Sequence, residues 1–163
     1  MILQDVLLPE FIKIDMESED KDEAFEELVD YYCQAELPVK LTAEKSKVHD
    51  EILHAIVTRE EKMSTGIHKG IAVPHGKTSI VKDIRGVLGI SKKGIQYDSL
   101  DGEPVYLLFM LISPLEDSEK HLRLLKHLAQ LIEIPQFQSE LQIQKDPGEA
   151  FRVIRKYEEM LSA

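Results

Sequence analysis

Residues 105–112 read "VYLLFMLI", an unbroken apolar run that ends at Ser113-Pro114. A strand with one face in water alternates apolar and polar residues, whereas a strand covered on both faces is apolar throughout. The proline that follows cannot donate to a ladder of hydrogen bonds, so it marks the end of the run. The run therefore predicts a central strand in a sheet that is covered on both faces.

Other strand-like segments precede this run. Ile71–Val73 is the only strand-sized piece of "MSTGIHKGIAVPHG" (63–76), whose glycines and proline exclude a continuous helix. The segments "RGVLGI" (85–90) and "GIQY" (94–97) are also predicted to be short strands, followed by a turn at Asp101-Gly102. We therefore expect the middle of the chain to supply the sheet.

Amphipathic helices are predicted on both sides of the strand region. The first begins at Asp20, which has the spacing of a capping box with Glu23, and it stops before Pro38. A second helix begins around Thr42–Lys45 and ends at about Arg59 or Glu60. A third is capped by Ser118 and has an apolar face made of Leu122, Leu125, Leu128, Ala129 and Ile132. A short helix follows Pro135, and the last helix is capped by Asp146. Together these elements predict one α/β layered domain over residues 1–163.

Composition excludes several classes of function. The chain has 20 basic and 30 acidic residues, and the resulting net charge of −10 opposes binding to nucleic acid. No apolar run approaches the roughly 20 residues that span a bilayer, and the N-terminus lacks the pattern of a secretory signal. Cys33 is the only cysteine, so no intrachain disulfide can form, and we expect it to be buried on a helix. A cytoplasmic protein without membrane insertion is predicted.

The stretch "GIAVPHGKT" (70–78) invites comparison with a phosphate-binding loop. A Walker-type loop has four residues between its first glycine and Gly-Lys-Ser/Thr, whereas Gly70 and Gly76 enclose five. Pro74 also removes an amide hydrogen that such a loop would direct at phosphate. Nucleotide binding is therefore disfavoured, and Lys77 and Thr78 are interpreted as an ordinary polar turn.

The six histidines raise the question of a metal site. Two ligands on one helix face need a spacing of three or four, but His49 and His54 are five apart and His121 and His127 are six apart. No carboxylate or cysteine spacing completes a cage. We expect neither a metal nor a cofactor.

His75 remains as a reactive group in its own right. A neutral imidazole is a ready nucleophile near neutral pH, and Pro74 and Gly76 are expected to form a turn that presents the ring. Phosphoryl transfer also needs cations and hydroxyls around the transferring group. Arg59, Thr65 and His121 are candidates for that role.

Each supporting residue also has an ordinary interpretation. Arg59 has the position of a surface cation at a helix end, Thr65 that of a turn hydroxyl, and His121 that of a polar residue in the first turn of a helix. Composition and spacing alone leave both interpretations open.

A longer stretch carries a resemblance to a known family. The segment "TREEKMSTGIHKGIAVPHG" (58–76), with "VLGISKKGIQYDSLDGEPVYLLFMLISP" (87–114) and "EKHLRLLKHLAQLI" (119–132), resembles the enzyme IIA domains of the bacterial phosphotransferase system. The similarity is to the fructose/mannitol and nitrogen-regulatory class and covers nearly the whole chain. It implies an α/β sandwich in which a mixed β-sheet is flanked by helices on both faces.

The resemblance also implies roles and partners. His75 matches the family's phosphorylated histidine, and Arg59, His121 and Thr65 match its supporting residues. The implied activity is acceptance of a phosphoryl group from HPr or its nitrogen-type paralogue and delivery to a separate IIB protein of a sugar transporter. A nitrogen-type regulatory protein, which uses the phosphoryl group as a signal and binds other proteins, is the alternative. His68 replaces the glycine that usually follows Thr-Gly-Ile, which makes a positive φ at this position costlier.

Overall fold

One sheet of six strands organises the computed structural model over the residues that it describes, 2–36 and 42–162. The strands are β1 (Ile12–Lys13), β2 (Gly66–His68), β3 (Ile71–Ala72), β4 (His75–Lys77), β5 (Arg85–Ile95) and β6 (Val105–Ser113). Their order is β1-β5-β6-β3-β2, and β4 also pairs with β6. The pairs β5/β6 and β2/β3 are antiparallel, whereas β1/β5, β3/β6 and β4/β6 are parallel. The predicted mixed sheet is confirmed.

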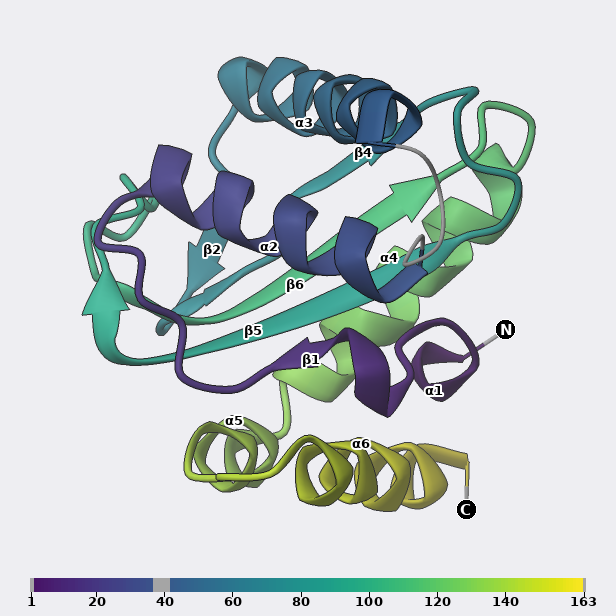
Figure 1. Ribbon diagram of the computed structural model, residues 1–163. Coiled ribbons are helices and arrows are strands. Elements are labelled where there is room, and N and C mark those ends of the chain that lie inside the picture. The colour runs from purple at the N-terminus through teal and green to yellow at the C-terminus, as the bar shows by residue number, and fades with distance from the viewer. Residues whose placement is uncertain (1, 37–41, 163) are drawn as a thin grey trace.

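Helices cover both faces of this sheet (Figure 1). They are α1 (Leu3–Val6), α2 (Lys21–Glu36), α3 (Thr42–Lys62), α4 (Ser118–Ile132), α5 (Pro135–Gln142) and α6 (Pro147–Ser162), with a 3-10 turn at Pro9–Phe11. Helices α2 and α3 lie on one face, and α4, α5 and α6 lie on the other. Among the described residues, no helix has the length and hydropathy needed to cross a membrane.

Strand β6 is the central strand that its apolar sequence predicts. Leu107, Phe109 and Leu111 point into the core beneath α4, α5 and α6, while Leu108, Met110 and Ile112 point into the core beneath α2 and α3. All six side chains are 0 or 1% exposed. Full burial of such a side chain stabilises a fold by about 1.5–3 kcal/mol. Strand β6 therefore contributes hydrophobic stabilisation to the cores on both faces of the sheet.

The helix ends largely follow the predicted caps. The Glu23 amide donates to Asp20 Oδ1 (2.9 Å), and the Glu149 amide donates to Asp146 Oδ1 (3.1 Å). Helix α2 ends at Glu36, and Pro38 lies outside the described residues. Cys33 is buried on α2, as expected, and burial raises the pKa of its thiol to about 11.

One strand prediction and one turn prediction are wrong. The segments predicted as separate strands at 85–90 and 94–97 form one strand, β5, which ends at Ile95 and shifts register between Ile90 and Ile95. The turn expected around Pro74–Gly76 is absent, because β4 pairs with β6 in the register set by β3: Ile71 faces Leu107 and His75 faces Leu111. The chain therefore runs straight on past Pro74, and His75 begins a strand.

Helix α3 lies directly against β4, and a glycine permits this approach (Figure 1). A Cβ atom built on Gly76 would lie 2.9 Å from the carbonyl carbon of Ala55 and 3.0 Å from its oxygen. These are backbone atoms of a long helix, so they cannot move aside as a flexible side chain would. The contact places the residues of α3 beside His75.

We expect Gly76→Ala to lower the free energy of unfolding by about 1–3 kcal/mol, because the new methyl group overpacks the α3/β4 contact. Urea denaturation measures the change. Gly86→Ala on β5 is the matched control, since its nearest neighbours are the Cβ of Leu7 at 3.2 Å and side-chain methyl groups of Leu7 and Leu111 at 3.5 Å. A Gly76→Ala protein as stable as the Gly86→Ala protein would contradict this account of the contact.

Candidate functional site

His75 lies beside a cavity of about 740 Å³ between α3, β4 and α4. Arg59, Lys77 and His121 line the same cavity, together with Asp50, Glu51, His54, Ala55, Thr58, Lys62, Gly76, Thr78 and Leu125. Three of the four predicted site residues, His75, Arg59 and His121, therefore meet at one cavity. The fourth, Thr65, lines a neighbouring cavity of about 210 Å³ that also reaches His75 and Arg59.

The His75 ring is held by the backbone two residues before it. Its Nδ1 lies 2.7 Å from the carbonyl oxygen of Val73. A carbonyl oxygen can only accept a hydrogen bond, so this contact assigns the proton to Nδ1 and leaves Nε2 with a free lone pair. The ring is thus in the tautomer whose Nε2 can act as a nucleophile.

The surroundings of His75 favour the neutral ring. Burial lowers the pKa of its imidazole, and the positive charges of Arg59 and Lys77 lower it further, against the opposing effects of the Val73 hydrogen bond and Glu60. The nucleophilic form is therefore the resting form near neutral pH.

His121 packs against His75 from helix α4. The two ring centroids are 5.4 Å apart and the ring planes are tilted by 52°. His121 is 5% exposed, and its Nδ1 lies 2.5 Å from Ser113 Oγ at the end of β6. Burial, and then electrostatic interaction with His75 and Lys77, lower the pKa of His121 to about 4. Two neutral imidazoles thus stand side by side.

His121 lies in the first turn of α4, as predicted, but its ring is buried. The buried stripe of α4 runs through His121, Leu124, Leu128 and Leu131, whereas Leu122, predicted to be on the apolar face, is 54% exposed. Ser118 is also not the cap: it is the first helical residue, and Asp117 occupies the cap position without a side-chain hydrogen bond.

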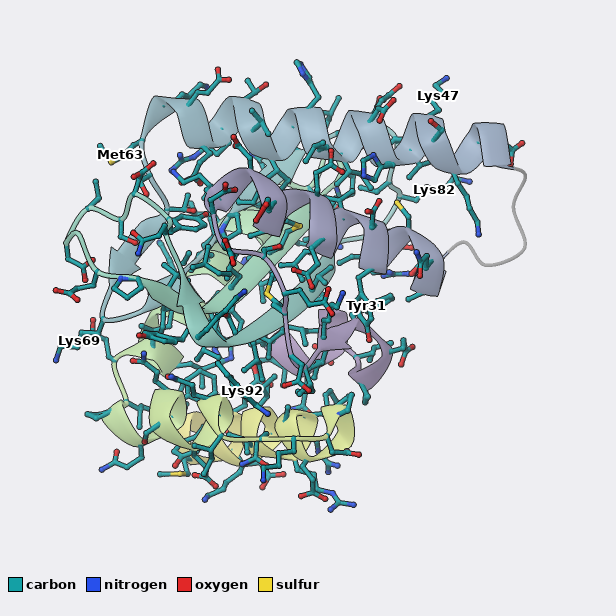
Figure 2. The ribbon with its side chains drawn as sticks, turned by 60° about the vertical axis from the view of Figure 1, so that its left-hand side comes forward. Tyr31, Lys47, Met63, Lys69, Lys82 and Lys92 are labelled. Atoms are coloured by element: carbon teal, nitrogen blue, oxygen red, sulfur yellow. The ribbon has the colours of Figure 1, made fainter. Side chains whose placement is uncertain are left out.

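Arg59 and Thr65 are tied to the segment that joins α3 to β2. Arg59 Nη1 donates to the carbonyl oxygen of Met63 (3.0 Å), which lies just past the end of α3 (Figure 2). The Thr65 hydroxyl contacts Glu60 Oε1 at 2.6 Å and the Tyr97 hydroxyl at 2.8 Å. Arg59 therefore borders the cavity as a cation, whereas the Thr65 hydroxyl is already occupied by buried partners.

Lys77 is a site residue that the sequence interpretation missed. It belongs to strand β4, not to a polar turn, and it lines the cavity two residues after His75. Its Nζ donates to Ser118 Oγ (2.9 Å) at the start of α4. The spacing of His75 and Lys77 could have indicated this role, because residues two apart in a strand point to the same face. That inference holds only if the chain continues as a strand after Pro74 instead of turning.

One group among the described residues has donor atoms spaced for a metal ion. It comprises Glu26 and Asp30 on α2 and His49 on α3, whose ligand atoms lie within 4.8 Å of one another. His49 Nε2 is already 3.1 Å from Glu26 and 2.9 Å from Asp30, and its Nδ1 contacts Asp50. Glu26, Asp30 and His49 do not line the cavity at His75. The side chain of His68 lies outside the described part of the structure, and the positive φ values nearby belong to Lys69 and Gly70.

The lowered pKa of His121 predicts how stability depends on pH. The unfolded ring binds a proton below its ordinary pKa of about 6.5, whereas the folded ring does so only near 4. Its contribution is therefore present above pH 6.5 and is lost as the pH falls towards 4. We expect the unfolding free energy, measured in urea at pH 7 and pH 5, to fall more steeply for the unmodified protein than for His121→Gln.

His49→Gln is the control for this prediction. The neighbouring carboxylates raise the pKa of His49 against the effect of burial, so its contribution is present at low pH and is lost as the pH rises. Replacing His49 should change the slope in the opposite sense. Parallel pH profiles for the unmodified protein and His121→Gln would show that His121 is not held neutral by the fold.

Comparison with known proteins agrees with this fold. The model of the family described as "Phosphoenolpyruvate-dependent sugar phosphotransferase system, EIIA 2" matches residues 5–157. The fructose-specific EIIABC component of Bacillus subtilis is 34% identical over 134 residues, which are 81% of this chain and 20% of that protein. The Nitrogen regulatory protein of Bradyrhizobium diazoefficiens is 28% identical over 154 residues, 94% of this chain and 95% of that protein.

A solved structure shares the architecture over nearly the whole chain. The crystal structure of Nitrogen Regulatory Protein IIA-Ntr from Neisseria meningitidis superposes with a TM-score of 0.78 at 27% identity, covering 92% of this chain and 97% of that one. The chain thus spans a fifth of the fructose component but almost all of the nitrogen regulatory proteins of Bradyrhizobium diazoefficiens and Neisseria meningitidis. Since the family model matches almost every residue from one end to the other, this chain belongs to the EIIA 2 family of the phosphoenolpyruvate-dependent sugar phosphotransferase system.

Proposed function

We propose that this chain is a phosphoryl carrier in which His75 Nε2 accepts a phosphoryl group from the phosphohistidine of HPr or its nitrogen-type paralogue and passes it to a IIB protein. The observation that carries the proposal is the hydrogen bond from His75 Nδ1 to the Val73 carbonyl (2.7 Å). It leaves Nε2 unprotonated in a ring that borders an open cavity. Family membership supplies the reaction class.

The step balances without an added base. The Nε2 lone pair forms a bond to phosphorus while the P–N bond of the donor breaks, and that electron pair returns to the donor's ring nitrogen. His75 keeps its Nδ1 proton, so the phosphorylated ring carries positive charge that the Val73 carbonyl oxygen faces directly. Transfer to IIB is the same exchange with His75 as the leaving group.

Two cations and one imidazole surround the place where the phosphoryl oxygens would lie. Arg59 approaches from α3 and Lys77 from β4, and both electrostatically depress the pKa of His75. His121 is proposed to accept a hydrogen bond from Ser113 at Nδ1 and to donate from Nε2 to a phosphoryl oxygen. The Thr65 hydroxyl is bonded to Glu60, so Thr65 is proposed to support the site by fixing the segment that joins α3 to β2.

The first test is intact mass after incubation with enzyme I, HPr and phosphoenolpyruvate. We expect one phosphoryl adduct that brief acid treatment removes, and no adduct on His75→Ala. His49→Ala, which changes a histidine away from the cavity, is the matched control and should be labelled fully. Labelling of folded His75→Ala to the same extent would reject the assignment of the acceptor.

The second test concerns the cations. Removing one group that stabilises developing charge slows an enzyme by roughly 100- to 1000-fold in sites closed to water. We expect about 10- to 100-fold for Lys77→Met and Arg59→Ala, because this cavity is open. Single-turnover transfer from phosphorylated HPr measures the rate, and Lys82→Met, a lysine outside the cavity lining, serves as control. Transfer by Lys77→Met at the control rate would remove Lys77 from the reaction.

A regulatory role is the second candidate, because the chain matches 95% of the length of a Nitrogen regulatory protein. In that case phosphorylation of His75 would be a signal read by other proteins, and the nitrogen-type paralogue would be the donor. Transfer rates from the two purified donors, followed by addition of a IIB protein, distinguish the roles. Both place the reaction in the cytoplasm, where phosphoenolpyruvate charges the donors.

A further inference from the structure

Glu60 is a buried carboxylate, and both of its oxygens have polar partners. Its side chain is 5% exposed. Oε2 accepts from the Thr65 backbone amide (2.8 Å) and lies 3.1 Å from Lys21 Nζ. Oε1 accepts from the Thr65 hydroxyl (2.6 Å) and lies 3.3 Å from the Tyr97 hydroxyl. A carboxylate held this way is stable in the interior only while its partners remain, so it strongly restrains their positions.

The hydroxyl groups in this cluster form a directed chain. Thr65 and Tyr97 have one hydroxyl proton each, but three oxygen–oxygen contacts join them to Glu60 and to each other. The two shortest contacts assign the protons: Tyr97 donates to Thr65 (2.8 Å), and Thr65 donates to Glu60 (2.6 Å). Lys21 Nζ stands 4.7 Å from the centroid of the Tyr97 ring and completes the cluster.

A continuous series of contacts leads from this cluster to His75. Glu60 holds the amide and hydroxyl of Thr65; the Thr65 carbonyl accepts from the Val73 amide (3.0 Å); and the Val73 carbonyl contacts His75 Nδ1 (2.7 Å). Pro74 has no amide hydrogen, but its carbonyl oxygen accepts from the Leu111 amide (2.9 Å), so β6 holds the segment after Val73. The hydrogen bond to Thr65 holds the segment at Val73 itself, and the orientation of the Val73 carbonyl depends on both anchors.

We propose that Glu60 is a positioning residue for phosphoryl transfer: through Thr65 and Val73 it holds the His75 ring in the Nδ1-protonated tautomer and aims Nε2 at the donor. This inference rests on the proposed function for its consequence, but the positioning itself is a property of the unphosphorylated protein. Glu60 does not line either cavity at His75, so apart from the effect of its charge on the His75 pKa it acts through other residues.

The first experiment reads the tautomer directly. Nitrogen NMR of the His75 ring is recorded for the unmodified protein, Glu60→Gln and Glu61→Gln, with no phosphoryl donor present. Glu61 is the matched control, because it is the next carboxylate on α3 and is exposed. We expect the Nδ1-protonated form to dominate in the unmodified protein and in Glu61→Gln, and a mixture of tautomers in Glu60→Gln. An unchanged tautomer in Glu60→Gln overturns the proposal.

The second experiment separates orientation from docking. Displacing a reacting group by a fraction of its contact distance costs up to about 100-fold in rate, so we expect a 10- to 100-fold lower single-turnover rate for Glu60→Gln. The donor concentration at half-maximal rate should stay the same, because the cavity surface is untouched. A change confined to that concentration would assign Glu60 to docking and contradict the positioning role.

Thr65→Val keeps the test decisive should Glu60→Gln fail to fold. It removes the hydroxyl but leaves the carboxylate, its lysine partner and the Thr65 backbone contacts, and it should shift the tautomer and the rate in the same direction. Where both fold, the double variant should be no worse than Glu60→Gln, since the two groups act through one link. Additive losses would overturn the link. If the unmodified protein accepts no phosphoryl group, the proposed function fails, and the tautomer measurement still decides the role of Glu60.

Discussion

Strand β6 pairs with β5 on one side and with the line formed by β3 and β4 on the other, while its side chains fill the cores of both layers. This position leaves little freedom in register, because a shift by one residue would exchange the side chains of the two cores. The pairing of His75 with Leu111 and of Lys77 with Ser113 follows from it. The same strand delivers Ser113 to His121. The geometry of the site is therefore set by the burial of a strand that contributes no residue to the cavity lining.

Much of this could be predicted from the sequence, and the failures have physical causes. The run at 105–112 identifies β6 because burial on both faces leaves no polar residue. The sequence divides strand β5 in two because the polar residues Ser91, Lys92 and Lys93 interrupt its apolar pattern, although the chain continues through a register shift. Strand β4 was missed because "HGK" after a proline has no strand propensity, and its pairing partner is remote in the sequence.

Among the site residues, too, some could be predicted from the sequence and others could not. The resemblance predicts His75, Arg59 and His121, and the structure brings all three to one cavity. Hydropathy placed Leu122 on the buried face of α4 and treated His121 as polar, whereas the ring of His121 is buried because Ser113 satisfies one of its nitrogens. The cluster around Glu60 could not be read locally, since Lys21 comes from α2 and Tyr97 from beyond β5.

If the proposed function holds, this phosphoryl carrier must release the phosphoryl group as readily as it accepts it, which limits how strongly the proposed site can bind that group. Cations that stabilise the phosphorylated state as much as the transition state would slow release. In the unphosphorylated protein Lys77 already donates to Ser118, and Arg59 donates to the Met63 carbonyl. Engaging a phosphoryl oxygen then replaces these hydrogen bonds, so only the difference between the two sets of contacts stabilises the product. The low pKa of His75 acts in the same direction, because a ring of weak basicity is a better leaving group. In the proposed mechanism, the contacts that hold the unphosphorylated site in order are thus also those that would keep the phosphoryl group exchangeable.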